Sequence, residues 1–245
     1  VMLERMLPNG AREAGIYAAS FRLLDAINQF GFLFATLLLP MFAKMIGRKE
    51  NVNHLVKFSS ELMLVMSVIA GVNCYFFRNE IMQMLYHDSN NYWAEIFGWL
   101  MLNFIPMSSI YVFGTLLTAK GSLKILNLIA FGGMAMNVSL NFFLIPKYGA
   151  LGATAATLAT QLFAALAHIL AANRQFAFKY EWKEVVKLLA YMVTCAVVSL
   201  AVKQLPMFWM VNFVTAALIC FVVAAKAKLV PLNEIWAMFR SKVAS

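Results

Sequence analysis

The sequence has few charged residues and few cysteines for its length. Charged residues make up 13% of the 245 residues and hydrophobic residues 62%, whereas a soluble domain has about 25% and 45–50%. The shortage of charge excludes an ordinary soluble domain, and the mean hydropathy of +0.75 indicates a chain that lies in a bilayer. The three cysteines fall within apolar segments at unrelated spacings, which predicts small buried side chains rather than disulfides.

Recognisable catalytic and metal-binding motifs are also missing. The sequence has no hydrolase elbow, no phosphate-binding glycine loop and no zinc helix motif. His54, His87 and His168 have no second ligand three or four residues further on, so we expect no metal site. The eleven acidic residues are dispersed, and the predicted loops are too short to hold a catalytic domain. We therefore expect no catalytic residues, no enzyme activity and no cofactor.

Long apolar segments dominate what is present. Seven of them can cross a hydrocarbon core of about 30 Å, which takes roughly 20 helical residues. They are predicted at residues 15–46, 58–77, 93–119, 122–144, 151–172, 185–202 and 207–230. The predicted fold class is thus an all-α, polytopic membrane helix bundle with seven transmembrane helices.

Proline and glycine mark the expected irregularities in these helices. Pro40 should kink the first span, and Pro106 with Asn103 should interrupt the third. Pro146 and Gly149 predict a six-residue turn between the fourth and fifth spans. After this turn, small residues recur every four positions, which predicts a closely packed antiparallel hairpin.

Basic residues are distributed unevenly between the two ends of the predicted spans. The net charge of +9 could indicate a nucleic-acid-binding protein. However, connections alternate sides of the membrane, so that fourteen basic residues fall on one side and five on the other. The fourteen are Lys44, Arg48, Lys49, Lys57, Lys120, Lys124, Arg174, Lys179, Lys183, Lys187, Lys226, Lys228, Arg240 and Lys242. This bias predicts a cytoplasmic C-terminus and needs no nucleic-acid partner.

The start of the chain suggests that something precedes it. Seven spans and a cytoplasmic C-terminus place the N-terminus outside the cytoplasm. Residue 1 is valine rather than methionine, and residues 1–7 resemble the end of an apolar helix. We therefore expect a C-terminal fragment whose N-terminal half is missing.

Three polar residues share one face of the first predicted span. Arg22, Asp25 and Gln29 lie within about 60° of one another on a helical wheel. One interpretation is a structural ion pair between Arg22 and Asp25 that fixes helix packing. The other is a stripe facing a cavity, with Arg22 available to an anionic headgroup and Asp25 tuning it or carrying a proton or cation.

Three asparagines extend the set of candidates for the substrate path. Asn103 lies in the third span, and Asn137 and Asn141 lie four residues apart on one face of the fourth. Such a face is costly in lipid unless it meets a protein interior or a wet cavity. Interhelical hydrogen bonds between packed helices are the alternative interpretation.

These motifs together resemble a known family. Residues 14–19 (Ala-Gly-Ile-Tyr-Ala-Ala) are followed by Arg22 and Leu23, then by the Leu-Leu-Pro of residues 38–40. Residues 137–153 end in Ile-Pro-Lys-Tyr-Gly-Ala-Leu-Gly-Ala. This combination is similar to the polysaccharide flippases, of the O-antigen type, in the multidrug/oligosaccharidyl-lipid/polysaccharide exporter superfamily.

The resemblance implies more than the composition does. Such proteins have two six-helix bundles around a central cavity, often with two extra C-terminal helices. They move undecaprenyl-diphosphate-linked oligosaccharides across the bacterial cytoplasmic (inner) membrane for cell-surface polysaccharide biosynthesis. The partners implied are a polyprenyl-diphosphate-linked glycan, membrane lipids and a coupling ion, either proton or sodium.

The resemblance also divides the chain. Its seven spans would be the last seven of fourteen. Residues 1–172 would form the second-bundle transport core, with most of its first helix missing. Residues 173–245 would form a cytoplasmic connection, two peripheral transmembrane helices and a cytoplasmic tail. A fragment without the first bundle should not transport on its own.

Two alternatives stay open at this point. A drug/cation antiporter of the same superfamily would favour an ion-coordinating acidic residue in the first bundle. A membrane-embedded enzyme or subunit of envelope biosynthesis would need acid/base pairs in its loops. A flippase needs basic groups in its cavity for the diphosphate, and Arg22 is the one in this sequence.

Overall fold

The computed structural model describes residues 2–178 and 182–230, and these fold into helices and their connections without a strand. The predicted cytoplasmic tail after residue 230, with Arg240 and Lys242, lies outside the described residues, as does Lys179. The helices are α1 (Met2–Met6), α2 (Gly10–Gly47), α3 (Asn53–Phe76), α4 (Arg78–Leu85), α5 (Asn91–Met101), α6 (Phe104–Ala119), α7 (Leu123–Phe176), α8 (Trp182–Lys203) and α9 (Trp209–Lys226).

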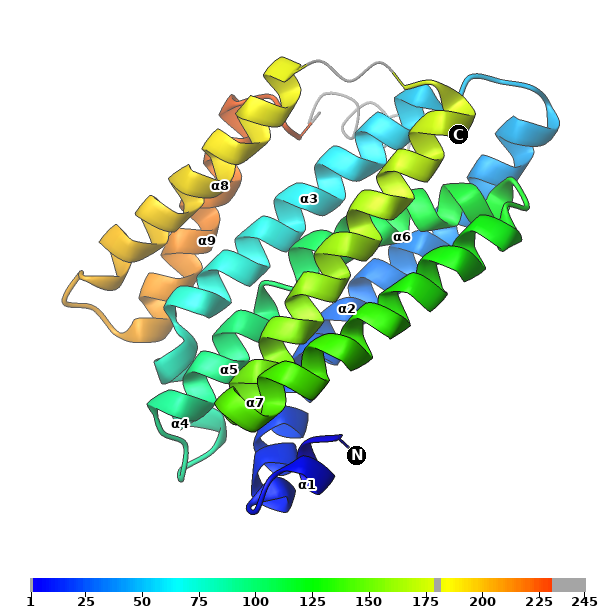
Figure 1. The fold of residues 1–245 in the computed structure, drawn as a ribbon. Coiled ribbons are helices and arrows are strands. Elements are labelled where there is room, and N and C mark those ends of the chain that lie inside the picture. The colour runs from blue at the N-terminus through cyan, green and yellow to red at the C-terminus, as the bar shows by residue number, and fades with distance from the viewer. Residues whose placement is uncertain (1, 179–181, 231–245) are drawn as a thin grey trace.

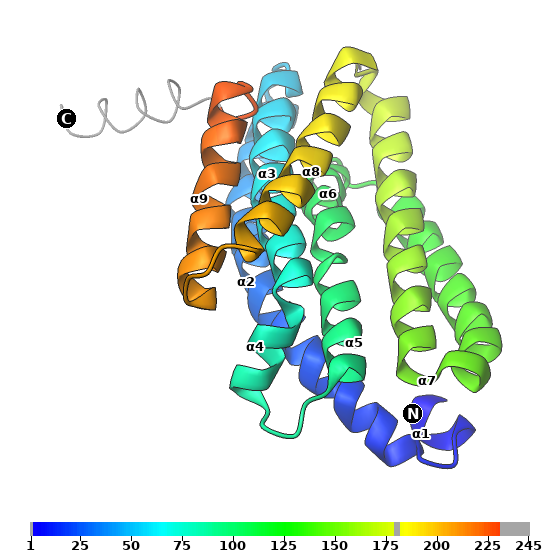
Figure 2. The same ribbon diagram turned by 90° about the vertical axis from the view of Figure 1, so that its left-hand side faces the viewer.

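The prediction of a polytopic helix bundle is confirmed. In the described residues, six helical stretches are long and apolar enough to cross a membrane, and α5 with α6 counts as one of them. The helix α7 has 54 residues, more than twice the roughly 20 that a crossing needs. It reverses direction at Gly149 and returns beside itself (Figure 2). Its two arms, 123–148 and 150–176, correspond to the predicted fourth and fifth spans.

The reversal itself is tighter than predicted. We expected a six-residue turn, but the helical hydrogen-bonding pattern continues through Pro146, and only Gly149 leaves the helical conformation. Its φ of 60° and ψ of −135° are accessible because glycine has no Cβ. The prediction of a six-residue turn is therefore wrong, since one residue is enough to reverse the chain.

The predicted interruption of the third span is confirmed. The helix α5 ends at Met101 and α6 begins at Phe104. The cause is Pro106, which lacks an N–H and whose ring crowds the carbonyl of Leu102, four residues earlier. The N–H of Ile105 bonds to that carbonyl instead, at 3.2 Å. In contrast, α2 remains one helix through Pro40.

The last two helices lie at one edge of the bundle (Figure 1). They pack against each other and against α3, through a cluster that includes Val65, Tyr191 and Cys220. All three cysteines are free and buried, as predicted. The central helix α6 packs instead against α2, α3 and α7.

The connections gather at two opposite ends of the bundle. The α2–α3 and α6–α7 connections share one end with the end of α7 and the start of α8, and the reversal of α7 and the α8–α9 connection lie at the other (Figure 1). Side chains join connections within each end. Lys57 pairs with Glu184 at the first end, and Lys203 pairs with Glu80 at the second, at 2.9 Å. The described basic residues of the two predicted sets divide between these two ends.

Cysteine labelling on intact cells can test which end is cytoplasmic. We expect a cysteine replacing Asn53 to be protected from an impermeant thiol reagent until the membrane is permeabilised, because its end carries most of the basic residues. A cysteine replacing Asp88, at the opposite end, should react at once. Both positions are exposed in the structure. The reverse pattern would overturn the predicted orientation.

Candidate functional site

The polar stripe on α2 is exposed along its whole length. Arg22, Asp25 and Gln29 all lie on the outer face of the helix, while Leu24 and Asn28 between them are buried. In the part of the chain that the structure describes, no hydrogen bond or ion pair joins Arg22 to Asp25. The predicted structural ion pair is therefore absent from this arrangement, and the role of the stripe stays a prediction.

Large apolar side chains follow the stripe on the exposed surface of α2. Phe30 is 73% exposed, Leu33 58% and Leu37 66%, which suits side chains that face lipid tails. A guanidinium on the same surface is costly in hydrocarbon, by about 2.5–3.5 kcal/mol at the centre of a helix. We therefore expect a wet cavity or another polypeptide beside the stripe.

The asparagines of the α7 hairpin form a hydrogen-bonded ladder. The Asn141 amide donates to the Asn137 carbonyl oxygen Oδ1 at 2.8 Å, and the Asn137 amide donates to Thr160 Oγ1 on the other arm at 3.3 Å. The small-residue face completes the contact, because a Cβ on Gly152 would lie 2.3 Å from the Leu144 carbonyl oxygen. The predicted close packing of the hairpin is confirmed.

Asn103 lies apart from these residues. It is fully buried at the break between α5 and α6. Its amide donates to the Trp99 carbonyl at 3.3 Å, and its Oδ1 has no partner among the described residues. The structure does not bring Asn103 to the surface that holds the α2 stripe or to the hairpin ladder.

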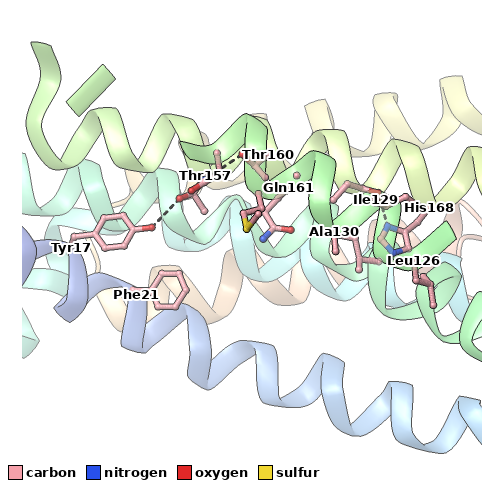
Figure 3. A pocket seen from close by; sticks show the side chains of 14 residues that line it. Tyr17, Phe21, Leu126, Ile129, Ala130, Thr157, Thr160, Gln161 and His168 are labelled. Atoms are coloured by element: carbon pink, nitrogen blue, oxygen red, sulfur yellow. Dashed lines mark hydrogen bonds between the residues drawn. The ribbon is translucent and has the colours of Figure 1, made fainter. Parts of the chain in front are cut away.

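A groove of about 550 Å³ separates α2 from the α7 hairpin (Figure 3), and Ile110 of α6 also lines it. Its polar lining consists of Tyr17, Asn137, Thr157, Thr160, Gln161 and His168. The hydroxyl groups of Tyr17 and Thr157 are 3.0 Å apart across the groove. The rest of the lining is apolar, and none of the lining residues carries a permanent charge, so the groove is neutral beside the charged α2 stripe.

Sequence reasoning missed most of this lining. Of the predicted site residues, only Asn137 lines the groove. Gln161 and His168 are seven residues apart and so share one face of the second arm, which is a signal that the sequence carried. His168 bonds through Nδ1 to the Ala164 carbonyl at 2.7 Å. Within the described residues, no three His, Cys, Asp or Glu side chains cluster to hold a metal ion.

Comparisons with known proteins place this geometry in a family. The chain matches the family described as "Lipid II flippase MurJ" over residues 14–224. It is also similar to the Lipid III flippases of Escherichia coli (strain K12) and Shigella flexneri. Each is 27% identical over 151 residues, which is 61% of this chain and 36% of the relative. The matched part of the chain therefore spans little more than a third of the length of each relative.

The comparisons support the expected flippase function only in its broader form. They support a flippase of lipid-linked glycans, but not the O-antigen type in particular. They also favour a transporter over the membrane-embedded enzyme that was one alternative. Because the match covers most of its length, this multi-pass membrane chain belongs to the MurJ family of lipid II flippases.

Proposed function

We propose that this chain is the second half of a transporter that flips undecaprenyl-diphosphate-linked glycans across the bacterial cytoplasmic membrane. The glycan would serve cell-envelope or cell-surface polysaccharide biosynthesis. The family match and the two Lipid III flippases support this proposal. The observation that carries it is Arg22, which is exposed on a helix long and apolar enough to cross a membrane and has no carboxylate partner in the described structure.

The chemistry of arginine suits a diphosphate. Its planar guanidinium can donate two parallel hydrogen bonds to phosphate oxygens and remains charged at any physiological pH. Asp25 lies one turn away on the same exposed face, where its carboxylate would moderate the attraction or carry a coupling proton or sodium ion. Gln29 would add a neutral hydrogen-bonding group for the sugar.

The position of the stripe also fits a two-bundle transporter. It lies on a face of α2 that no other helix of the described chain covers, and a second bundle would face it across a central cavity. Residues up to 172 would form this half of the transport core. The α8–α9 pair, which packs on α3 at the bundle edge, would be peripheral, and the C-terminus would be cytoplasmic.

Depleting the full-length protein from cells tests the function. If no other flippase replaces it, the lipid-linked glycan should accumulate in the inner leaflet, and the corresponding surface polymer should be lost. Both quantities can be measured, by extraction of the lipid and by surface labelling. Normal surface polymer after complete depletion would contradict the proposal.

A further inference from the structure

A single carboxylate joins three helices at the end of the bundle where α7 reverses. The backbone N–H of Ala150 donates to Glu13 Oε2 at 2.8 Å and lies 3.1 Å from the Tyr92 hydroxyl oxygen. The Tyr92 hydroxyl in turn donates to the same Glu13 oxygen at 2.5 Å. Glu13 belongs to α2, Tyr92 to α5 and Ala150 to α7, so the cluster connects segments up to 137 residues apart in the sequence.

The reversal of α7 is shaped around this carboxylate. A Cβ on Gly149 would lie 2.7 Å from Glu13 Oε2 and 2.8 Å from the Tyr92 hydroxyl oxygen. Glycine therefore serves two purposes here, because it adopts the positive φ and lets both acceptors approach. The Ala150 N–H is one of the donors that the second arm leaves unpaired at its start. A carboxylate at that place also interacts favourably with the helix dipole.

The cluster lies next to the groove between α2 and the hairpin, because Glu13 is about one helical turn from Tyr17, which lines that groove. Directly beyond it, Tyr17 and Thr157 make the next contact between the two elements. Further along, the elements separate, and α2 packs on α6 instead, where Gly31 meets the ring of Tyr111. The direct contacts of the hairpin with α2 are thus concentrated at this one end, while its main packing is on α6.

We propose that Glu13, Tyr92 and the Ala150 N–H form a latch that closes this end of the groove. While the carboxylate holds its two donors, α2, α5 and the hairpin move as one body. When the latch opens, the hairpin can swing away from α2 and widen the groove. The latch controls movement within the chain and would operate whatever molecule is transported, so it goes beyond the proposed function.

Distance measurements in the full-length protein can test the latch. Spin labels on cysteines replacing Arg12 and Lys147, which are both exposed, would report the separation of α2 from the α7 reversal in a bilayer. The unmodified latch should give one short, narrow distance distribution. In Glu13→Leu, we expect the ratio of long to short distances to rise about tenfold, which corresponds to losing hydrogen bonds to a charged group.

Two further variants make the test specific. Glu13→Gln keeps an acceptor oxygen but loses the charge, so its ratio should lie between those of the unmodified protein and Glu13→Leu. Glu95→Gln is the matched control, because this carboxylate is exposed on α5 and outside the cluster, and its distribution should not change.

Each outcome of these measurements either supports or overturns the latch. Distributions in both Glu13 variants that match the unmodified protein would overturn the latch. If Glu13→Leu does not fold, Tyr92→Phe takes its place, since it removes the hydroxyl donor and should also raise the ratio. No change in Tyr92→Phe and Glu13→Gln would overturn the proposal. The readout is a distance rather than transport, so failure of the latch is distinguishable from failure of the proposed function.

Discussion

Replacing Arg22 with alanine in the full-length protein should reduce glycan export by about 10- to 100-fold without lowering the amount of protein. The expected factor corresponds to about 1.5–3 kcal/mol for a hydrogen bond to a charged group. Arg22→Lys should restore part of the export, because the charge survives while the bidentate geometry is lost. Export and membrane protein level, measured on the same cultures, check this result.

Asp25 provides the control for a purely structural role of Arg22. If the two residues merely balance each other, Arg22→Ala or Asp25→Asn alone should destabilise the protein by leaving a charge unpaired in the membrane. The double variant should then recover both stability and export. Since the structure shows no contact between them, we expect no such recovery. Export restored in the double variant would refute a role of Arg22 in substrate binding.

The second large effect is expected at Gly152, where the two arms of the α7 hairpin meet. Even the Cβ of an alanine would lie 2.3 Å from the Leu144 carbonyl oxygen, and this backbone atom cannot rotate away. Overpacking of this kind costs about 1–3 kcal/mol, and more for larger side chains. We therefore expect Gly152→Ala to lower the unfolding temperature in detergent and Gly152→Leu to remove most of the folded protein.

Gly133 in the same hairpin is the matched control. A Cβ there would meet the Thr160 methyl group at 3.6 Å, which is ordinary van der Waals contact. Gly133→Ala should therefore fold in normal amounts. If Gly152→Leu were as stable as Gly133→Ala, the close packing of the hairpin would be wrong.

The architecture could be predicted from the sequence because it follows from local properties. Apolar runs of about 20 residues define membrane crossings whatever their neighbours, and Pro106 breaks its helix through its own missing N–H. Asn137 and Asn141 could be placed on one face because four residues make about one helical turn. These features need no knowledge of which helices touch.

The contacts between distant segments could not be predicted in the same way. The Glu13 carboxylate gains its role only when the fold brings the Ala150 N–H to it from another helix. Likewise, the Tyr17–Thr157 contact depends on how the hairpin packs against α2. The complete burial of Asn103 also depends on packing between helices, and its place in a substrate path stays a prediction.

Flipping by the purified full-length protein in liposomes tests the central claim most directly. An undecaprenyl-diphosphate-linked glycan would be placed in the inner leaflet, and an impermeant glycan-modifying enzyme outside would report its arrival in the outer leaflet. We predict that the modified fraction rises well above that of protein-free liposomes, and that the Arg22→Ala protein falls back towards that background. A modified fraction equal to that of protein-free liposomes, or an undiminished one with Arg22→Ala, would contradict the account.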